Sequence, residues 1–343
     1  MITIVNDFNL RSFNTFRLDA SCRQWIEYTS PSDLPDIMAQ IGGGRFINIG
    51  AGSNMLFERD FDGAVLHSRI LDLSMEPSAD GRMIVRAGAG IEMDSLILQL
   101  CEAGLWGLEN LSGIPGDVGA SAVQNVGAYG VEAADAIVKV ECFDTVEGRF
   151  IELSAADCDY AYRYSMFKHP DNKHRYLITF VCFAVSATPS PKISYGSLKE
   201  LQRLDCLTPL QVRDAIISIR NSKLPKVEEI GSAGSFFKNP VVTSDKFEKV
   251  KRIIESDGGD SGSVPHYVTD AGVKIPAAWL IDQCGLKGAK CGGAAVWHKQ
   301  PLVIVNATGH ATAADILSLE QKIINTVSNR FGIRLEPEVE HIG

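Results

Sequence analysis

The hydroxyl of Ser235 could take part in catalysis. The residue stands in the run GSAGSFFKNP at positions 231–240, directly before two phenylalanines. A nucleophilic serine needs a neighbouring base, but neither a GxSxG motif nor a nearby histidine accompanies Ser235. A serine that donates a proton needs only placement and hydrogen-bonded support. A structural serine in a β-bulge is the competing interpretation.

The run LEPEV at positions 335–339 carries two carboxylates close to the C-terminus. In an extended segment Glu336 and Glu338 share one face, and Pro337 keeps the residue before it extended. Carboxylates this close together could make one of them an acid or an orienting group for a substrate. A solvated sheet edge is the more common meaning of such charges.

A long glycine-rich segment, GLENLSGIPGDVGASAVQNVGAYGVE at positions 107–132, has the composition of a phosphate-binding loop. Glycines mark places where the backbone bends sharply or approaches a ligand, and this segment is poor in charge. Backbone N–H groups there, with Ser121, Gln124 and Asn125 beside them, could form a nest for phosphate oxygens. The segment therefore predicts a phosphate site for a large nucleotide cofactor, with an ordinary surface loop as the alternative.

A second glycine turn, GAGSN at positions 50–54, follows a predicted strand at 46–49. Met55 occupies the position of the third glycine in a GxGxxG fingerprint, which argues against a Rossmann site. We expect a second turn that faces phosphate, although a plain tight turn explains this short run equally well.

Several cations could supply the positive charge that an anionic ligand needs. Arg163 lies in the run YAYRYS at 160–165, and in an extended conformation it would share a face with Ser165, opposite the tyrosines. Such an arginine could clamp a carboxylate or polarise an oxyanion, although a structural ion pair is commoner. Arg220 and Lys223 follow a predicted helix, where they would complement the negative helix end or bind a diphosphate.

The elements that must position these residues form a mixed α+β pattern. Short apolar or alternating runs predict strands at 23–29, 46–49, 63–68, 82–90, 175–185 and 301–306, with a hairpin over 136–153. Apolar residues at helical spacing predict helices at 30–40, 94–102, 208–219, 244–255 and 311–331. Gly332 should end the last helix, and the alternating run at 333–342 predicts a final strand.

Composition limits the classes of function. A chain of 343 residues with 45% apolar and 22% charged residues predicts a globular protein of about two or three domains. A net charge of -9 argues against nucleic acid or an anionic membrane as the main partner. No apolar run of membrane-spanning length and no signal-peptide pattern is present, so we expect a cytoplasmic protein. Eight cysteines and seven histidines lack ligand spacing, so no metal site is expected.

Taken together, these segments resemble one family closely: the UDP-N-acetylenolpyruvoylglucosamine reductases (MurB) of peptidoglycan precursor synthesis. No single run is specific, but their order and spacing are. The matching runs are NTF at 14–16, GAGSN at 50–54, the glycine-rich segment at 107–132, YRYSMFK at 162–168, SYGSL at 194–198, KLP at 223–225, AGSFFKNP at 233–240, AAWLIDQCGLKG at 277–288 and LEPEV at 335–339.

The resemblance implies an α+β protein with a two-lobed FAD-binding domain of vanillyl-alcohol-oxidase/PCMH type and a smaller α+β substrate domain. The implied FAD-binding region covers residues 1–213, with lobes at about 1–66 and 67–213 and a PCMH-type core at about 17–188. The substrate-binding domain would follow at 214–330. A C-terminal strand at 331–343 would carry an active-site glutamate.

In that family NADPH reduces a non-covalently bound FAD, which passes hydride to the enolpyruvyl double bond of UDP-N-acetylglucosamine enolpyruvate. The resemblance implies that Ser235 protonates the enol formed after hydride addition, while Glu338 and Arg163 stabilise it and hold its carboxylate. Substrate contacts are implied for Tyr195, Arg220, Lys223, Lys238, Asn239 and Gln300, with Tyr195 in a loop that folds over the nucleotide. FAD contacts are implied for Gly50, Ala51, Gly52, Ser53, Asn54, Ile114, Pro115, Gly116, Ser121, Gln124, Asn125, Gly127, Ala128 and Tyr129.

Departures from the family pattern are few, and two other functions stay open. Lys226-Val227 follows KLP where Asp-Pro is usual, Ala161 stands where glycine is common, and Trp297-His298 shifts a histidine by one place, so His298 receives no role. A flavin oxidase acting on an alcohol is the first alternative, although neither glycine turn carries the His or Cys that tethers flavin in several such enzymes. A sugar-nucleotide-binding protein without catalysis is the second. We expect a monomer that binds a UDP-sugar.

Overall fold

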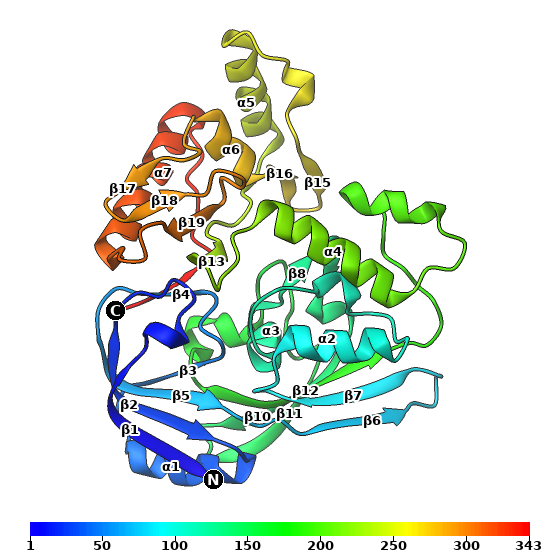
Figure 1. Cartoon of the computed structure of the whole chain (residues 1–343), viewed down its shortest axis with the longest axis vertical. Helices are drawn as coiled ribbons and strands as arrows, with labels where there is room; N and C mark the ends of the chain where they lie inside the picture. The colour runs from blue at the N-terminus through cyan, green and yellow to red at the C-terminus, as the bar shows by residue number, and fades with distance from the viewer. The chain divides into compact units, whose positions relative to one another are not determined.

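The computed structural model describes residues 1–343, apart from the side chain of Ser197, and divides into two compact units (Figure 1). Unit 1 comprises Met1–Asn9, Ser21–Gly52 and Phe61–Ser222, and unit 2 comprises Leu10–Ala20, Ser53–Asp60 and Lys223–Gly343. Two short segments of the N-terminal part therefore pack with the C-terminal part of the chain. The functional boundaries expected at residues 213 and 330 stay a prediction.

The first sheet of unit 1 has the strand order β1-β2-β5-β3. β1 runs antiparallel to β2, whereas β2 and β3 both run parallel to β5. A capping box between Ser30 and Asp33 starts the short helix pair that precedes β3, and Gly42 ends it with φ 58°. The elements are β1 (Ile2–Asn9), β2 (Ser21–Tyr28), α1 (Leu34–Ile41), β3 (Phe46–Ile49) and β5 (Phe61–Ser68).

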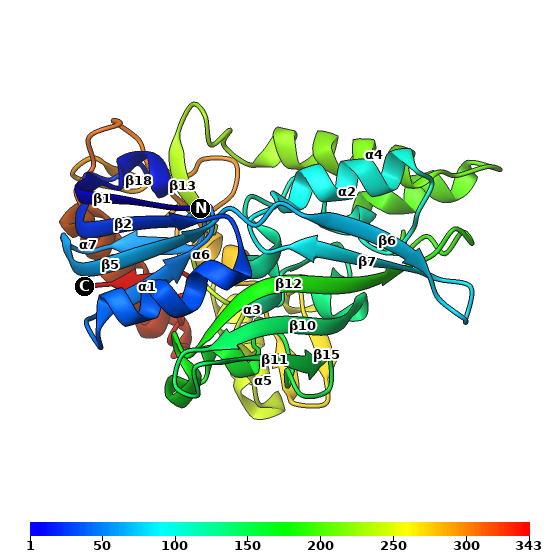
Figure 2. The same ribbon diagram turned by 90° about the horizontal axis from the view of Figure 1, so that it is seen from below.

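The second sheet of unit 1 is antiparallel throughout, in the order β11-β10-β12-β7-β6, as Figure 2 shows. Its central strand β12 is buried along nearly its whole length because both sheet faces are covered. Side chains of α2 and α3 pack on one face, and side chains of α1, β2 and β5 pack on the other. The elements are β6 (Leu73–Pro77), β7 (Met83–Gly88), α2 (Met93–Glu102), α3 (Val118–Gln124), β10 (Ile137–Asp144), β11 (Arg149–Ser154) and β12 (Tyr176–Val185).

Unit 1 closes with a short hairpin and a long helix. β8 (Gly127–Ala128) pairs with β9 (Val131–Glu132) within the glycine-rich segment. The helix α4 (Pro209–Lys223) is joined to α2 by a bidentate ion pair between Arg213 and Asp94, in which Nη2 lies 2.7 Å from Oδ2. Trp106 and Leu198 pack against Val212 and Ile216 of this helix.

Unit 2 is built around an antiparallel sheet in the order β13-β19-β18-β17 and the long helix α7. A capping box between Thr312 and Asp315 starts α7, and Gly332 ends it with φ 60°. The remaining elements include a three-stranded sheet, β14-β16-β15, and a parallel pair of β4 with β20. Their bounds are β4 (Met55–Phe57), β13 (Gly231–Ser235), β14 (Val241–Val242), α5 (Ser244–Ser256), β15 (Tyr267–Thr269), β16 (Gly272–Lys274), α6 (Ala277–Gln283), β17 (Lys290–Cys291), β18 (Ala294–Val296), β19 (Val303–Asn306), α7 (Ala313–Phe331) and β20 (Glu340–Ile342).

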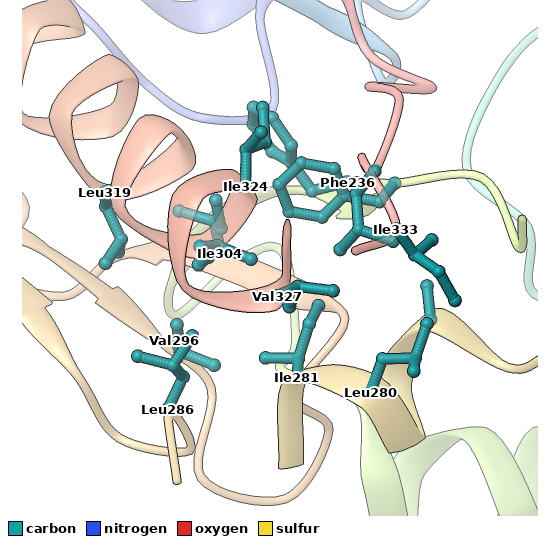
Figure 3. Close-up of a cluster of buried hydrophobic side chains, with 14 of the residues drawn as sticks. Phe236, Leu280, Ile281, Leu286, Val296, Ile304, Leu319, Ile324, Val327 and Ile333 are labelled. Carbon is teal, nitrogen blue, oxygen red and sulfur yellow. The ribbon is translucent and has the colours of Figure 1, made fainter. Parts of the chain in front are cut away.

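The core of unit 2 gathers α6, α7, β18 and β19 around Phe236, as the close-up in Figure 3 shows. Phe236, Ile304 and Val327 are almost completely buried. Burying each such side chain stabilises the folded state by about 1.5–3 kcal/mol. Phe16, Leu18 and Leu56 belong to the same cluster, which explains why their short N-terminal segments pack with unit 2.

The predicted α+β class is confirmed, and two local predictions are wrong. The run 160–165 is not extended: Ala161 and Tyr164 exchange backbone hydrogen bonds across a tight turn, and Arg163 has φ 54°. The final strand covers only Glu340–Ile342, so Glu338 precedes it: residues 336–338 pair with residues 236–238 through an isolated bridge, whereas β20 pairs with β4. Among the described residues, no helix is long and apolar enough to cross a membrane.

Candidate active site

The two predicted phosphate-binding segments of unit 1 lie against each other. Gly50 follows β3, and a Cβ added there would lie 3.0 Å from Oδ2 of Asp117 and 3.2 Å from Cβ of Ala120. A larger residue at this position would therefore require Asp117 and Ala120 at the start of α3 to move by a few tenths of an ångström. Gly52 with φ 62° and Gly116 with φ 139° provide the two bends next to this contact.

The glycine-rich segment is not a continuous loop, because it contains the helix α3. The N–H groups of Val118 and Gly119 donate to the carbonyls of Ile91 and Ala89, at 2.8 and 3.0 Å. These bonds anchor the helix start, so these two N–H groups are already used within the protein. The phosphate contacts predicted for Ile114, Pro115 and Gly116 concern the turn just before the helix, and they stay a prediction.

Three polar side chains that were predicted to contact the cofactor make hydrogen bonds that stabilise the fold of this segment. Nδ2 of Asn125 donates to Oε2 of Glu132 and to the carbonyl of Ala161, at 2.8 and 2.9 Å, and Oδ1 accepts from Ala134 N at 3.0 Å. Oγ of Ser121 donates to the carbonyl of Val118 at 2.7 Å, and Gln124 accepts from Lys168. Part of their hydrogen-bonding capacity thus holds the local fold.

Arg163 is placed by the turn at 161–164 against the β8-β9 hairpin. Its Nη2 donates to the carbonyl of Gly127 at 2.7 Å, and its own carbonyl accepts from Nζ of Lys168 at 3.1 Å. A Cβ at Gly127 would lie 2.8 Å from Nη1 of Arg163, so the glycine makes room for the guanidinium. Unit 1 therefore brings Arg163 together with the predicted cofactor residues Gly127 and Ala128.

Tyr129, Tyr195 and Arg220 form a second cluster in unit 1. The two tyrosine rings meet edge to face, with centroids 6.0 Å apart, and Arg220 hydrogen-bonds the side chain of Tyr129. Burial lowers the pKa of Arg220, while Tyr129 and Asp94 raise it. A guanidinium stays protonated in proteins, so the cluster presents a positive charge beside aromatic rings.

Asn110 holds this second cluster together and was not predicted as a site residue. It is almost completely buried, and its Nδ2 donates to the carbonyls of Tyr129 and Lys192, at 3.0 and 2.8 Å. The two carbonyls come from the glycine-rich segment and from the segment that precedes Tyr195. A buried amide with both donors used in this way fixes two loops against each other.

Ser235 stands at an irregularity at the end of β13 in unit 2. The register against β19 shifts between Ser232 and Ser235, and Gly234 has φ 68°, so the strand bulges there. Ser235 is exposed, whereas Phe236 and Phe237 are buried. The predicted β-bulge at Ser235 is thus confirmed, and this bulge exposes the hydroxyl.

The segment that carries Glu338 lies beside the one that carries Ser235. Glu338 N donates to the carbonyl of Phe236 at 2.8 Å, and Lys238 N donates to the carbonyl of Glu336 at 3.0 Å. From the other side, Nδ2 of Asn54 donates to the carbonyl of Glu338 at 3.1 Å. Unit 2 therefore brings together two predicted catalytic residues and Asn54, which had been predicted only as a cofactor contact.

Of the remaining predicted substrate residues of unit 2, Lys238, Asn239 and Gln300 lie in loops, whereas Lys223 is the last residue of α4 and so lies within the helix rather than after it, as had been predicted. Oδ1 of Asn239 accepts from Ala277 N at 2.9 Å and so caps the start of α6. The indole of Trp297 donates to the carbonyl of Lys223 at 3.0 Å, and Gln300 accepts from Val303 N through its backbone carbonyl at 3.0 Å. Lys223 is exposed and Lys238 is partly buried.

Asp117 is a titratable residue near the glycine turns that the sequence did not single out. It is 9% exposed and begins α3, but no side-chain capping bond is found for it among the described residues. Burial and the negative charge of Glu92 raise the pKa of Asp117 to about 7, although Arg69 lowers it. A carboxyl with this pKa takes up a proton near neutral pH.

Comparison with known proteins gives full-length matches. Residues 225–342 match the family model of the UDP-N-acetylenolpyruvoylglucosamine reductase C-terminal domain, and residues 24–154 match that of an FAD binding domain. The UDP-N-acetylenolpyruvoylglucosamine reductase of Bacteroides fragilis (strain YCH46) is 42% identical over 341 residues, covering 98% of this chain and 99% of the relative. That of Porphyromonas gingivalis (strain ATCC BAA-308 / W83) is 40% identical over 344 residues, covering 99% of each.

A solved structure shows the same fold. The UDP-N-acetylenolpyruvylglucosamine reductase (MurB) of Thermus caldophilus aligns with a TM-score of 0.65 at 23% identity, covering 100% of this chain and 99% of that one. Identity at this level supports the fold and no more.

Within the described residues, no group of three His, Cys, Asp or Glu side chains could hold a metal ion.

Proposed function

Because this chain belongs to the UDP-N-acetylenolpyruvoylglucosamine reductase family, we propose that it reduces UDP-N-acetylglucosamine enolpyruvate to UDP-N-acetylmuramate in peptidoglycan precursor synthesis. It is an FAD-dependent oxidoreductase, with NADPH as the co-substrate. The observation that carries the proposal is the identity of 40% or more to reductases along their full length.

The glycine turns of unit 1 fit a dinucleotide such as FAD. Gly50, Gly52 and Gly116 adopt or allow conformations in which the backbone, free of side chains, can approach a pyrophosphate. We propose FAD contacts for the residues that the family pattern implies in unit 1: Gly50, Ala51, Gly52, Ile114, Pro115, Gly116, Ser121, Gln124, Asn125, Gly127, Ala128 and Tyr129. Ser53 and Asn54, the next residues in sequence after Gly52, complete the set.

FAD, when bound, supplies a hydride for one carbon of the enolpyruvyl double bond. The chain must then provide a proton for the neighbouring carbon, and Ser235 is the proposed donor. Its exposure at the bulge, beside the segment that carries Glu338, supports this role. Positioned proton donation is worth about 10²–10⁴ in rate.

Glu338 and Arg163 are proposed to stabilise the enol and to hold the carboxylate of the substrate. Backbone bonds hold the main chain at Glu338 from both sides, and the bond to Gly127 holds the guanidinium of Arg163. Groups that are positioned before the reaction stabilise developing charge with little reorganisation in the transition state.

The UDP diphosphate needs a locally positive site in a chain of net charge -9. We propose that Tyr195 and Arg220 contribute from unit 1, and Lys223, Lys238, Asn239 and Gln300 from unit 2. The cation and aromatic rings of the Tyr129, Tyr195 and Arg220 cluster support this assignment. We further propose a cytoplasmic monomer without a nucleic-acid partner, which light scattering and cell fractionation would check.

A half-reaction experiment tests the proposed function. The purified protein should be yellow, lose its colour anaerobically with NADPH, and regain it when UDP-N-acetylglucosamine enolpyruvate is added. A colourless protein that binds UDP-sugars would point to the binding-protein alternative. Flavin that stays attached after mild denaturation would point to the alcohol oxidase.

A further inference from the structure

His341 lies between two carboxylates in unit 2, and these three side chains are called here the His341 cluster. Nδ1 of His341 lies 3.0 Å from Oε1 of Glu58, and Nε2 lies 3.4 Å from Oε2 of Glu320. Glu58 directly follows β4, Glu320 belongs to α7, and His341 is the central residue of β20. The cluster therefore links the C-terminal strand to a helix and to a strand from the N-terminal part of the chain.

The contact between His341 and Glu320 joins two buried polar atoms. Apart from their mutual distance of 3.4 Å, Nε2 of His341 and Oε2 of Glu320 have no hydrogen-bond partner among the described residues. Because a buried polar group without a partner costs free energy, this pairing favours keeping His341 beside Glu320.

Other charged groups surround the His341 cluster. Burial and the negative charge of Glu58 raise the pKa of Glu320, whereas His341 and Arg334 lower it. Arg59 and the C-terminal residue Gly343 lie next to Glu58. Glu340, beside His341 in β20, adds a further negative charge. More carboxylates than cations therefore surround His341.

The His341 cluster is connected to Glu338 through backbone pairing. His341 pairs with Leu56 in the β4-β20 ladder, and Glu340 N donates to the carbonyl of Asn54 at 2.9 Å. The side chain of Asn54 in turn holds the carbonyl of Glu338. The ring of His341 also meets the ring of Phe236 edge to face, with centroids 6.3 Å apart.

We propose that His341, held between Glu58 and Glu320, is a positioning residue for Glu338 in the reduction of the enolpyruvyl group. This inference rests on the proposed function. It assigns to the cluster the task of holding β20 in register, so that Glu338 stays beside the bulge of Ser235.

The test compares His341→Phe with His67→Phe in the full-length enzyme. His67 is a matched control because its Nδ1 also lies 3.0 Å from a glutamate oxygen, that of Glu27, and its ring packs on Trp25, but it belongs to unit 1. Stopped-flow absorbance would follow flavin reduction by NADPH and flavin reoxidation by the UDP-sugar.

We expect His341→Phe to slow reoxidation by about 10- to 100-fold, the range that misplacement of a reacting group by about 1 Å produces. Flavin reduction should be unchanged, and His67→Phe should leave both steps unchanged. If His341→Phe folds poorly, Glu320→Gln in the same chain removes the unpaired buried carboxylate, and reoxidation should stay slow.

Unchanged reoxidation in a folded His341→Phe variant would show that the cluster serves stability alone. The variant Glu338→Gln tests the role of Glu338 separately from that of His341. If its flavin is reoxidised at the normal rate, the proposed role of Glu338 fails, and this inference fails with it. If only Glu338→Gln is slow, the proposed function stands and the role of His341 is refuted.

Discussion

At Ser235 the chain presents an exposed hydroxyl directly before two buried phenylalanines. Gly234 takes a positive φ that other residues adopt only with strain, and Phe236 and Phe237 anchor the chain directly afterwards. The backbone at Ser235 is therefore held in place, although the side chain of Ser235 is exposed. A proton donor with a high pKa depends on such placement, because the group itself is a weak acid.

Replacing Ser235 with alanine should separate the two half-reactions. NADPH should reduce the flavin of Ser235→Ala at the normal rate, whereas reoxidation by the UDP-sugar should fall by about 10²–10⁴ because the proton donor is missing. Ser263→Ala, at an exposed serine elsewhere in unit 2, is the control. Normal reoxidation of Ser235→Ala in stopped-flow absorbance would assign the proton to another group.

Asp117 should make the stability of the protein depend on pH. Its pKa of about 7 lies above that of an unfolded aspartate, so the folded state binds the proton more tightly and loses stability as pH rises from about 4 to above 7. Three pKa units correspond to at most about 4 kcal/mol. Asp117→Asn should therefore raise the thermal midpoint at pH 8 and give a gain that shrinks towards pH 4. A gain that is equal at pH 4 and pH 8 in calorimetry would contradict this assignment.

At the scale of elements, the ion pair between Asp94 and Arg213 joins the start of α2 to α4. Oδ1 of Asp94 also accepts from Gly113 N at 2.6 Å, so the same carboxylate holds the turn that leads into the glycine-rich segment. Burial opposes ionisation, but the bonds from Arg213 and Gly113 are stronger together and lower the pKa of Asp94. The pair contributes stability above about pH 4 and loses it as the pH falls below that value.

Breaking this pair should destabilise unit 1. Arg213→Leu leaves the partly buried carboxylate of Asp94 without its cation, which typically lowers the free energy of unfolding by about 3–5 kcal/mol. Lys226→Met, which removes an exposed ion pair with Glu229, should change stability little. Urea denaturation at pH 7 measures both, and equal midpoints for the two variants would argue against a stabilising role of the buried pair. Asp94→Asn together with Arg213→Leu should recover part of the loss.

At the scale of the whole molecule, the sequence predicted what local patterns encode. Apolar residues at helical spacing located α2 and α7, and a buried run located β12. β1 was missed because most of its residues are exposed, and α3 because its small residues resemble those of a loop. The tight turn at Arg163 depends on the anchoring of neighbouring residues, which alternation of residue types does not reveal.

The site was predictable only in part, because its members come from distant segments. Ser235 and Glu338 were singled out by residue type, but their backbone pairing was not visible in either run. Asn54 looked like a phosphate-turn residue, whereas its side chain in the structure holds the carbonyl of Glu338. His341, Glu58 and Glu320 carry no sequence motif, and only the packing of β20 against β4 and α7 brings them together.

The interleaved division into units leads to a prediction about fragments. Phe16 and Leu18 from Leu10–Ala20, and Leu56 from β4, fill the same core as α6 and α7. In addition, Ser232 N donates to the carbonyl of Thr15 at 2.9 Å, and β20 pairs with β4. A fragment of residues 223–343 lacks all these partners, so β13 and β20 would lose backbone bonds and the core would contain cavities.

We therefore expect the isolated fragment 223–343 to lack a cooperative thermal transition and dispersed amide signals in NMR, although it covers nearly the whole C-terminal family model. Three large side chains missing from one core cost about 2–5 kcal/mol each, which together equals the stability of a typical domain. The full-length chain is the control, and it should unfold cooperatively under the same conditions. Appending residues 10–20 and 53–60 to the fragment through flexible linkers should restore folding, because both segments contribute to this core. Cooperative unfolding of the bare fragment would show that α5, α6, α7 and their sheet suffice, and that the two N-terminal segments pack on a core that is already complete.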